Sequence, residues 1–122
     1  MSNSKPSSTT QGIACEGWWQ EEGWGRQPMI ELVLRFESGK IFGMGRDVIG
    51  TFTLSGTISE GSKVVMIKQY LGMHAVDYVG AYDGEGLMWG QWRIGPLHDQ
   101  WMIKFTDFKE SLATRMEIKE IG

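Results

Sequence analysis

Apolar and polar residues alternate along most of this chain, a period of two that is typical of strands with one buried face. The pattern is clear at residues 28–37, where one face carries Ile30, Leu32, Leu34 and Phe36. It is clearest at residues 50–58, where one face carries Phe52, Leu54 and Ile58 and the other carries hydroxyl groups. These segments are predicted to be half-buried β-strands.

Short turns rich in glycine separate the predicted strands, as at Glu37-Ser38-Gly39-Lys40. Eight strands are expected, at residues 16–22, 28–37, 41–45, 50–58, 63–71, 74–82, 86–95 and 99–106. The last turn before the eighth strand is expected to be Gly95-Pro96-Leu97-His98. A run of hairpins of this length closes naturally into an all-β, eight-stranded antiparallel up-and-down barrel. The seventeen glycines favour closure, and a flat two-sheet sandwich is the competing architecture.

The two ends of the chain differ in composition from the barrel domain predicted at 13–106. Residues 1–12 are rich in serine and threonine and are expected to be a disordered N-terminal tail. Residues 107–122 are expected to form a short C-terminal helix or tail, because Asp107 and Glu110 resemble a capping box. Alternation at 116–121 leaves a further strand open as an alternative.

Composition and charge exclude several classes of function. The 122 residues form one domain with a net charge of −3, and the twelve lysines and arginines are scattered, so no nucleic acid partner is expected. No apolar run reaches the roughly 20 residues of a membrane helix, and the hydroxyl face at 51–57 argues against a membrane barrel. Cys15 is the single cysteine, which excludes an internal disulfide. The polar N-terminus lacks a signal-peptide pattern, so a cytoplasmic location is expected.

A resemblance to a known superfamily rests on the first strand. Gly17-Trp18-Trp19 resembles the Gly-x-Trp of the calycins, which include lipocalins, fatty-acid-binding proteins and avidins. The stretches 47–52, 68–70, 78–80 and 90–92 are also similar to small bacterial barrel domains, so the resemblance covers about residues 16–106. It implies a barrel in which the tryptophan packs across the closed end and the interior binds a small ligand. Neither the Arg-x-Tyr clasp of fatty-acid-binding proteins nor the biotin-binding hydroxyls of avidins can be placed here.

The candidate ligand-binding residues are Asp47, Lys68, Tyr70, His74, Tyr78 and Trp92. His74 and Tyr78 are four residues apart on one strand and share a face with Val76, so they are expected to point inward. The position of Lys68 depends on the turn that follows it. A two-residue loop at Gly72-Met73 would leave Lys68 outside opposite Asp77, whereas a three-residue loop would place it inside with Tyr70 and Tyr78.

An interior lysine would need an acidic partner or an anionic ligand, because a buried and unpaired ammonium is too costly to keep. Asp47, in the loop before the strand at 50–58, is the obvious internal partner, although it could instead cap its own backbone. If Lys68 faces inward, the sequence predicts a basic cavity that prefers anionic or strongly polar ligands. The two readings of Lys68 stay open at this point.

The sequence contains no recognisable catalytic or metal-binding motif. There is no nucleophile elbow, phosphate-binding glycine loop or Cys-His pair, and His74 and His98 lack metal-ligand spacing, so no metal, cofactor or enzymatic activity is expected. The expected function is non-catalytic binding of a small molecule inside the barrel. The alternative is a protein-interaction or assembly module with a packed barrel, docking through Trp18 or Trp24. A homo-oligomer stays open, and proton-transfer catalysis is the least favoured reading.

Overall fold

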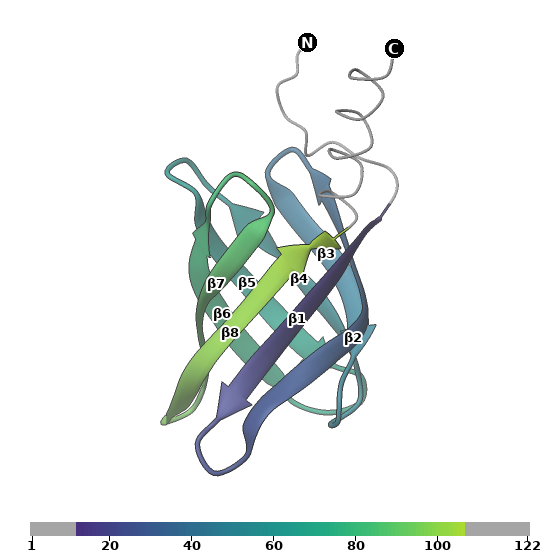
Figure 1. Ribbon diagram of the computed structural model, residues 1–122, viewed down its shortest axis with the longest axis vertical. Helices are drawn as coiled ribbons and strands as arrows, with labels where there is room; N and C mark the ends of the chain where they lie inside the picture. The colour runs from purple at the N-terminus through teal and green to yellow at the C-terminus, as the bar shows by residue number, and fades with distance from the viewer. Residues whose placement is uncertain (1–11, 107–122) are drawn as a thin grey trace, which may run out of the picture.

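Eight antiparallel strands form a closed barrel in the computed structural model, which describes residues 12–106 (Figure 1). Each strand pairs with the next one along the chain, and β8 pairs with β1 to close the sheet. The predicted barrel is therefore confirmed, and the two-sheet sandwich is excluded. The expected N-terminal tail, apart from residue 12, and the expected C-terminal helix lie outside the described residues.

The observed strand boundaries lie close to the predicted ones. The strands are β1 (Ile13–Glu21), β2 (Gly25–Glu37), β3 (Lys40–Arg46), β4 (Thr51–Ile58), β5 (Lys63–Tyr70), β6 (Ala75–Tyr82), β7 (Leu87–Ile94) and β8 (Leu97–Phe105). The turn before β8 is shorter than expected, because Ile94 pairs directly with Leu97 and leaves only Gly95 and Pro96 in the loop. No helix within residues 12–106 is long and apolar enough to cross a lipid bilayer.

A β-bulge in β2 overturns one expected inward position. Ile30 was predicted on the inner face with Leu32, but its side chain is 43% exposed, and Met29 is buried instead. The pairing of β2 with β3 shifts between Ile30 and Val33, and Glu31 has a φ of 53°. One extra residue in the strand reverses the alternation on its N-terminal side. The simple period of two could not reveal this reversal.

The turn between β5 and β6 decides the orientation of Lys68. Lys68 pairs with Val76 and Gln69 with Ala75, so Leu71, Gly72 and Met73 form the loop. Gly72 has a φ of 72°, a conformation that glycine adopts without steric cost. This is the three-residue register, and it places Lys68 on the inner face with Tyr70 and Tyr78.

Inward-facing glycines allow the sheet to coil tightly enough to close. Gly80 of β6 pairs with Gly90 of β7, and a Cβ added to either would lie 1.9 Å from a backbone oxygen of the opposite strand. The same distance separates a Cβ on Gly56 from the carbonyl oxygen of Val65. Because no side chain fits there, the backbones of neighbouring strands can approach closely at these bends.

The barrel interior is filled by apolar and aromatic side chains over most of its length. The buried hydrophobic residues are Trp19, Met29, Leu32, Leu34, Phe36, Ile41, Phe52, Leu54, Val64, Met66, Tyr70, Val76, Tyr78, Met88, Trp92, Trp101, Ile103 and Phe105. Trp19 is among them, as expected for the inward residue of the Trp pair. Trp18 lies on the outer face, where the guanidinium of Arg26 stands 3.9 Å from its ring centroid.

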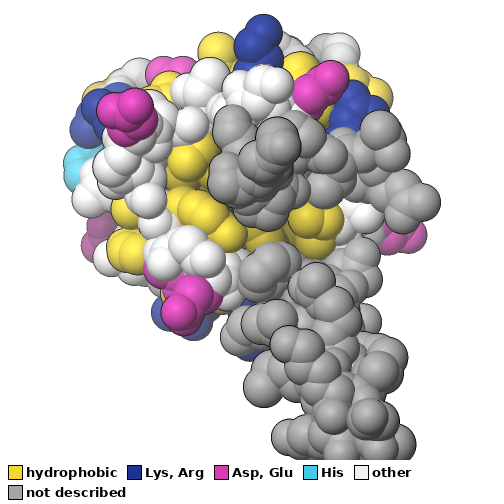
Figure 2. Space-filling view, turned by 90° about the horizontal axis from the view of Figure 1, so that it is seen from above, with side chains coloured by type: hydrophobic (Ala, Val, Ile, Leu, Met, Phe, Trp, Pro, Cys, Tyr) yellow, Lys and Arg dark blue, Asp and Glu magenta, His cyan; other side chains and the backbone are white. Residues whose placement is uncertain are grey.

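The two ends of the barrel differ. One end carries the β2–β3, β4–β5 and β6–β7 turns. Figure 2 shows this end from above, with hydrophobic side chains visible between polar ones. Partly buried Ile58 and Tyr82 belong to this end. The opposite end carries the β1–β2, β3–β4, β5–β6 and β7–β8 connections. We call it the pocket end, because the candidate site described next opens there.

Candidate functional site

An ion pair is buried inside the barrel near the pocket end. Lys68 extends from β5, and Asp47 comes from the loop that joins β3 to β4. The Lys68 Nζ lies 2.7 Å from the Asp47 Oδ2, and the two side chains are 1% and 0% exposed. The sequence suggested this partnership as one of two roles for Asp47, and the structure brings the two residues together.

Asp47 is held from several sides. Its Oδ2 accepts hydrogen bonds from Lys68, from the Tyr70 hydroxyl at 2.7 Å and from the Trp19 indole nitrogen at 3.0 Å. Its Oδ1 accepts a bond from the backbone N–H of Ile49 at 2.9 Å. The carboxylate therefore caps its own loop and pairs with Lys68 at the same time, so both roles considered for Asp47 are present.

The Lys68 ammonium has further partners beyond Asp47. It donates to the Tyr78 hydroxyl at 3.1 Å and lies 3.6 Å from the sulfur of Met29. Aromatic rings surround it as well, with its Nζ 4.2 Å from the centroid of Phe52 and 4.9 Å from that of Tyr70. Such rings attract a desolvated cation through their quadrupoles. The ammonium is thus stabilised by a carboxylate, a hydroxyl and π-faces together.

Burial shifts the pKa values of both charged groups. It lowers the pKa of Lys68 to about 8, although Asp47 acts in the opposite direction. Burial alone would raise the pKa of Asp47, but the hydrogen bond and charge of Lys68, with the bonds from Tyr70 and Ile49, outweigh it and hold that pKa below its usual range. At neutral pH the two groups therefore form an ion pair whose charges cancel.

The two tyrosines of this cluster are neutral phenols. Burial, and then the negative charge of Asp47, raise the pKa of Tyr70 and of Tyr78 well above the ordinary value. Tyr70 uses its proton in the bond to Asp47. Tyr78 accepts from Lys68, and its own proton has no acceptor among the described residues. The Tyr78 hydroxyl is therefore an available donor, polarised by the ammonium behind it.

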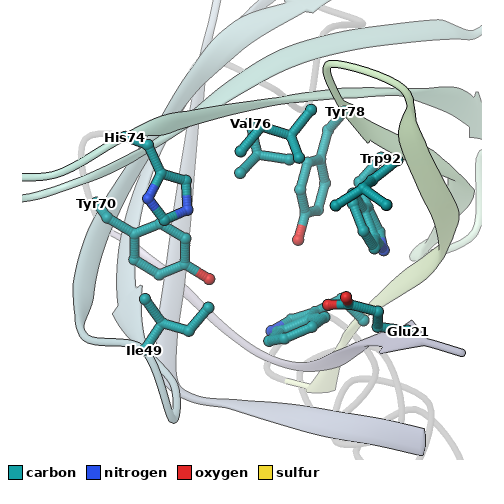
Figure 3. A pocket seen from close by; sticks show the side chains of 10 residues that line it. Glu21, Ile49, Tyr70, His74, Val76, Tyr78 and Trp92 are labelled. Atoms are coloured by element: carbon teal, nitrogen blue, oxygen red, sulfur yellow. The ribbon is translucent and has the colours of Figure 1, made fainter. Parts of the chain in front are cut away.

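A pocket of about 200 Å³ opens above this cluster. Its lining residues are Trp19, Glu21, Ile49, Tyr70, His74, Val76, Tyr78, Trp92, Ile94 and Leu97. Figure 3 shows Tyr70 and His74 on one side of the space and Glu21 and Trp92 on the other. The hydroxyls of Tyr70 and Tyr78 point into the space between them. Aromatic rings thus form much of the wall, and phenol hydroxyls supply polar groups.

The six predicted site residues fall into two groups. Tyr70, His74, Tyr78 and Trp92 line the pocket, with His74 exposed. Lys68 and Asp47 do not line it, but they bond to the hydroxyls of tyrosines that do. The expectation of a basic cavity is wrong, because the carboxylate of Asp47 neutralises the Lys68 ammonium in place of an anionic ligand.

Sequence reasoning missed several residues of this site, among them two large ones. Trp19 was expected to close an end of the barrel, but its ring lines the pocket while its N–H binds Asp47. Glu21 lies two residues further along β1 and therefore faces the same side. Glu21 lay within the predicted strand at 16–22, and the strand period places it on the face of Trp19, which is the signal that could have indicated it. Ile49 comes from the β3–β4 loop, whose geometry the alternation does not define, and Leu97 was expected in a turn but begins β8.

No group of three or more His, Cys, Asp or Glu side chains within residues 12–106 is arranged to hold a metal ion. Comparison with protein-family models, with curated proteins and with solved structures finds no match. The closed eight-stranded antiparallel barrel fits a small calycin-like barrel in architecture. The evidence about function therefore comes from the geometry of the pocket.

Proposed function

We propose that this protein is a calycin-like binding protein that holds one small, largely apolar molecule in the pocket without converting it. The observation that carries the proposal is the arrangement of Trp19, Trp92 and Tyr70 as an aromatic wall around about 200 Å³ of space. Pockets that bind small molecules are typically apolar and concave, with a few placed polar groups. The Tyr78 hydroxyl is such a group here.

The size of the pocket limits the ligand. An engineered apolar cavity of about 150 Å³ in another protein is large enough to bind benzene. A pocket of about 200 Å³ therefore suits a single ring with a short substituent, and a long fatty acid would not fit. The ring planes of Trp19 and Trp92 lie at 89°, with centroids 6.2 Å apart. A flat ligand could stack on one of these rings and meet the edge of the other.

The polar cluster supports an orienting role. Tyr78 receives a bond from the Lys68 ammonium and can donate its own proton to an acceptor on the ligand. Because Lys68 is paired with Asp47, the donor is fixed in place before a ligand arrives. Preorganisation of this kind reduces the entropy lost on binding.

The buried cluster of Lys68, Asp47, Tyr70 and Tyr78 is suited to holding a ligand more than to transferring protons, and the carboxylate of Glu21 and the imidazole of His74 line the pocket outside this cluster. A general base needs a free carboxylate, imidazole or amine within reach of the substrate proton. Here the Asp47 carboxylate is fully buried and saturated by donors from Lys68, Tyr70 and Trp19. Both tyrosines keep their protons, because their pKa values are raised. These groups are suited to holding a ligand in one orientation.

Filling the pocket tests the proposal. Val76 lines the pocket from β6, and Val79 on the same strand points outward. Benzyl alcohol, a neutral one-ring probe, should change the tryptophan fluorescence of the wild-type protein and of Val79→Phe. Val76→Phe should remain folded by circular dichroism and lose the response. Equal titrations of both variants, or no response from the wild-type protein, would count against an interior site.

A second candidate is the interaction module, which an apolar outer surface favours. Trp24 is 56% exposed in the β1–β2 connection, and outward-facing Val65, Ile67 and Val79 lie beside a hollow on the barrel wall. Such patches commonly mark interaction surfaces. Light scattering across a range of concentrations would test self-association, and a monomer at every concentration would leave no support for a homo-oligomer.

A further inference from the structure

We infer that the pocket selects a positively charged ligand, a one-ring organic ammonium whose charge is held by the carboxylate of Glu21. This inference rests on the proposed binding function and adds the chemical class of the ligand. It reverses the sign expected from the sequence, where an inward Lys68 suggested an anionic ligand.

Glu21 is an acidic group in the pocket without a cationic partner among the described residues. Ion pairs within residues 12–106 join Arg46 to Glu31 and Lys68 to Asp47. The Glu21 side chain is half-buried at the end of β1 and lines the pocket. In Figure 3 its carboxylate is turned toward the space between Trp92 and Tyr70. A ligand entering the pocket would therefore meet this carboxylate.

The charges of the pocket lining and of the buried pair beneath it sum to a negative value. Lys68 and Asp47 cancel each other at 2.7 Å, and both are buried behind the tyrosine hydroxyls. The remaining ionisable groups of the lining are Glu21 and His74, apart from the neutral phenols. When histidine is counted as neutral, as in the net charge of −3 for the chain, the lining carries the charge of one carboxylate. A cation entering this partly desolvated space is attracted, and a carboxylate ligand is repelled.

The tryptophan walls suit a cation for a second reason. The indole N–H of Trp19 is used by Asp47 and that of Trp92 by the carbonyl oxygen of Gln20, at 3.0 and 2.8 Å. Both residues therefore present ring surface to the pocket and not a hydrogen-bond donor. Ring faces bind ammonium groups, and tryptophan does so most strongly. A cation between the ring of Trp92 and the carboxylate of Glu21 would interact with both.

The ligand then has a defined orientation. Its ammonium lies toward Glu21 and Trp92, and its ring fills the space lined by Ile49 and Tyr70. An acceptor on the ring could bond to the available proton of Tyr78. This arrangement assigns each part of a small aromatic amine to a group that is already in place.

Three probes with the same ring and different charges test the inference. Benzylamine is a cation at neutral pH, benzyl alcohol is neutral and benzoate is an anion. Benzylamine should bind to the wild-type protein about tenfold more tightly than benzyl alcohol, which corresponds to about 1.4 kcal/mol. Benzoate should bind most weakly. The affinities can be measured by fluorescence titration at low ionic strength.

Two adjacent glutamates provide a matched pair of variants. Glu21→Gln should abolish the preference for benzylamine over benzyl alcohol. Glu22→Gln makes the same change in net charge at an exposed residue that does not line the pocket, so it should keep the preference. Equal binding of all three probes, tighter binding of benzoate, or equal effects of the two substitutions would overturn the inference while leaving a small-molecule site. If no probe binds, the proposed function fails as well.

Discussion

The buried ion pair predicts strong energetic coupling between Lys68 and Asp47. The perturbation is a double-mutant cycle of Lys68→Met, Asp47→Asn and the combined variant. Methionine keeps the length of the lysine side chain, and asparagine keeps an oxygen that can accept from the N–H of Ile49. The cycle isolates the interaction between the two charges from the other contacts of each residue.

The magnitude follows from what each substitution leaves behind. Lys68→Met leaves the Asp47 carboxylate buried, although Trp19 and Tyr70 still donate to it. Asp47→Asn leaves the ammonium without an anionic partner, in contact with the Tyr78 hydroxyl, the Met29 sulfur and the surrounding aromatic rings. Removing one member of a buried pair typically costs about 3–5 kcal/mol. Each single variant should fall in this range, and Asp47→Asn should lie toward its upper end.

The combined variant should lose less stability than the two single variants lose in sum. No uncompensated charge remains in it, and neutral replacement of a buried pair is often close to neutral in stability. We expect a coupling energy of at least about 2 kcal/mol from urea unfolding at neutral pH. In thermal melts, each single variant should lose on the order of 10 °C.

The chain supplies its own control in the pair of Arg46 with Glu31. The Arg46 Nε lies 2.8 Å from the Glu31 Oε1, close to the separation in the buried pair, but the two side chains are 52% and 66% exposed. A cycle of Arg46→Met and Glu31→Gln should give a coupling of only about 0.2–1 kcal/mol. Equal coupling energies from the two cycles, or a Lys68→Met variant as stable as the wild-type protein, would contradict a strong interaction in the buried pair.

Three further predictions concern the tryptophan pair, the barrel bends and the titration of Lys68. Trp19→Ala should cost about 3–5 kcal/mol in urea melts, and Trp18→Ala on the outer face far less; equal losses would contradict the assigned faces. Gly90→Ala should destabilise the protein strongly, because the added Cβ would lie 1.9 Å from the carbonyl oxygen of Val79. Gly61→Ala is the control, because its Cβ meets open space and only the positive φ causes strain. Equal melting temperatures of the two variants by circular dichroism would argue against the tight bend. Burial lowers the pKa of Lys68 to about 8 in the folded protein from an ordinary value of 10.5, so the unfolded chain binds more protons between these two pH values. The free energy of unfolding of the wild-type protein should therefore rise with pH over this interval, relative to that of Lys68→Met, by about 3 kcal/mol, since one pKa unit corresponds to about 1.4 kcal/mol. A difference between the two proteins that stays constant with pH would contradict the shift.

Most of the fold could be predicted because strand alternation and turn residues are local signals. The hairpin at Ser38-Gly39 follows from Gly39, which takes its φ of 81° without steric cost, and the alternation at 50–58 gives the face of Phe52 directly. Ile30 was misplaced because a bulge adds one residue without changing the hydrophobic pattern that surrounds it. The period of two is therefore reliable only between irregularities of the strand.

The sequence predicted four residues of the pocket lining, Tyr70, His74, Tyr78 and Trp92, but not the charge of the pocket. The register at Gly72 had two solutions, and only the pairing of Lys68 with Val76 distinguishes them. Asp47 reaches Lys68 from a loop 21 residues away in sequence, a contact that depends on how the barrel closes. Its effect is to cancel the lysine charge, which leaves Glu21 as the unpaired charge of the pocket. Local patterns do not contain this tertiary information.

The most direct test of the account is an NMR titration of the ¹⁵N-labelled protein with benzylamine, followed at the indole N–H signals of its six tryptophans. Trp19 and Trp92 line the pocket, whereas Trp18 and Trp89 lie on the outside of the barrel wall. The account predicts saturable shifts of the Trp19 and Trp92 signals, with those of Trp18 and Trp89 unchanged. Shifts confined to Trp18 or Trp89, or no saturable shift at any tryptophan, would contradict a binding site inside the barrel.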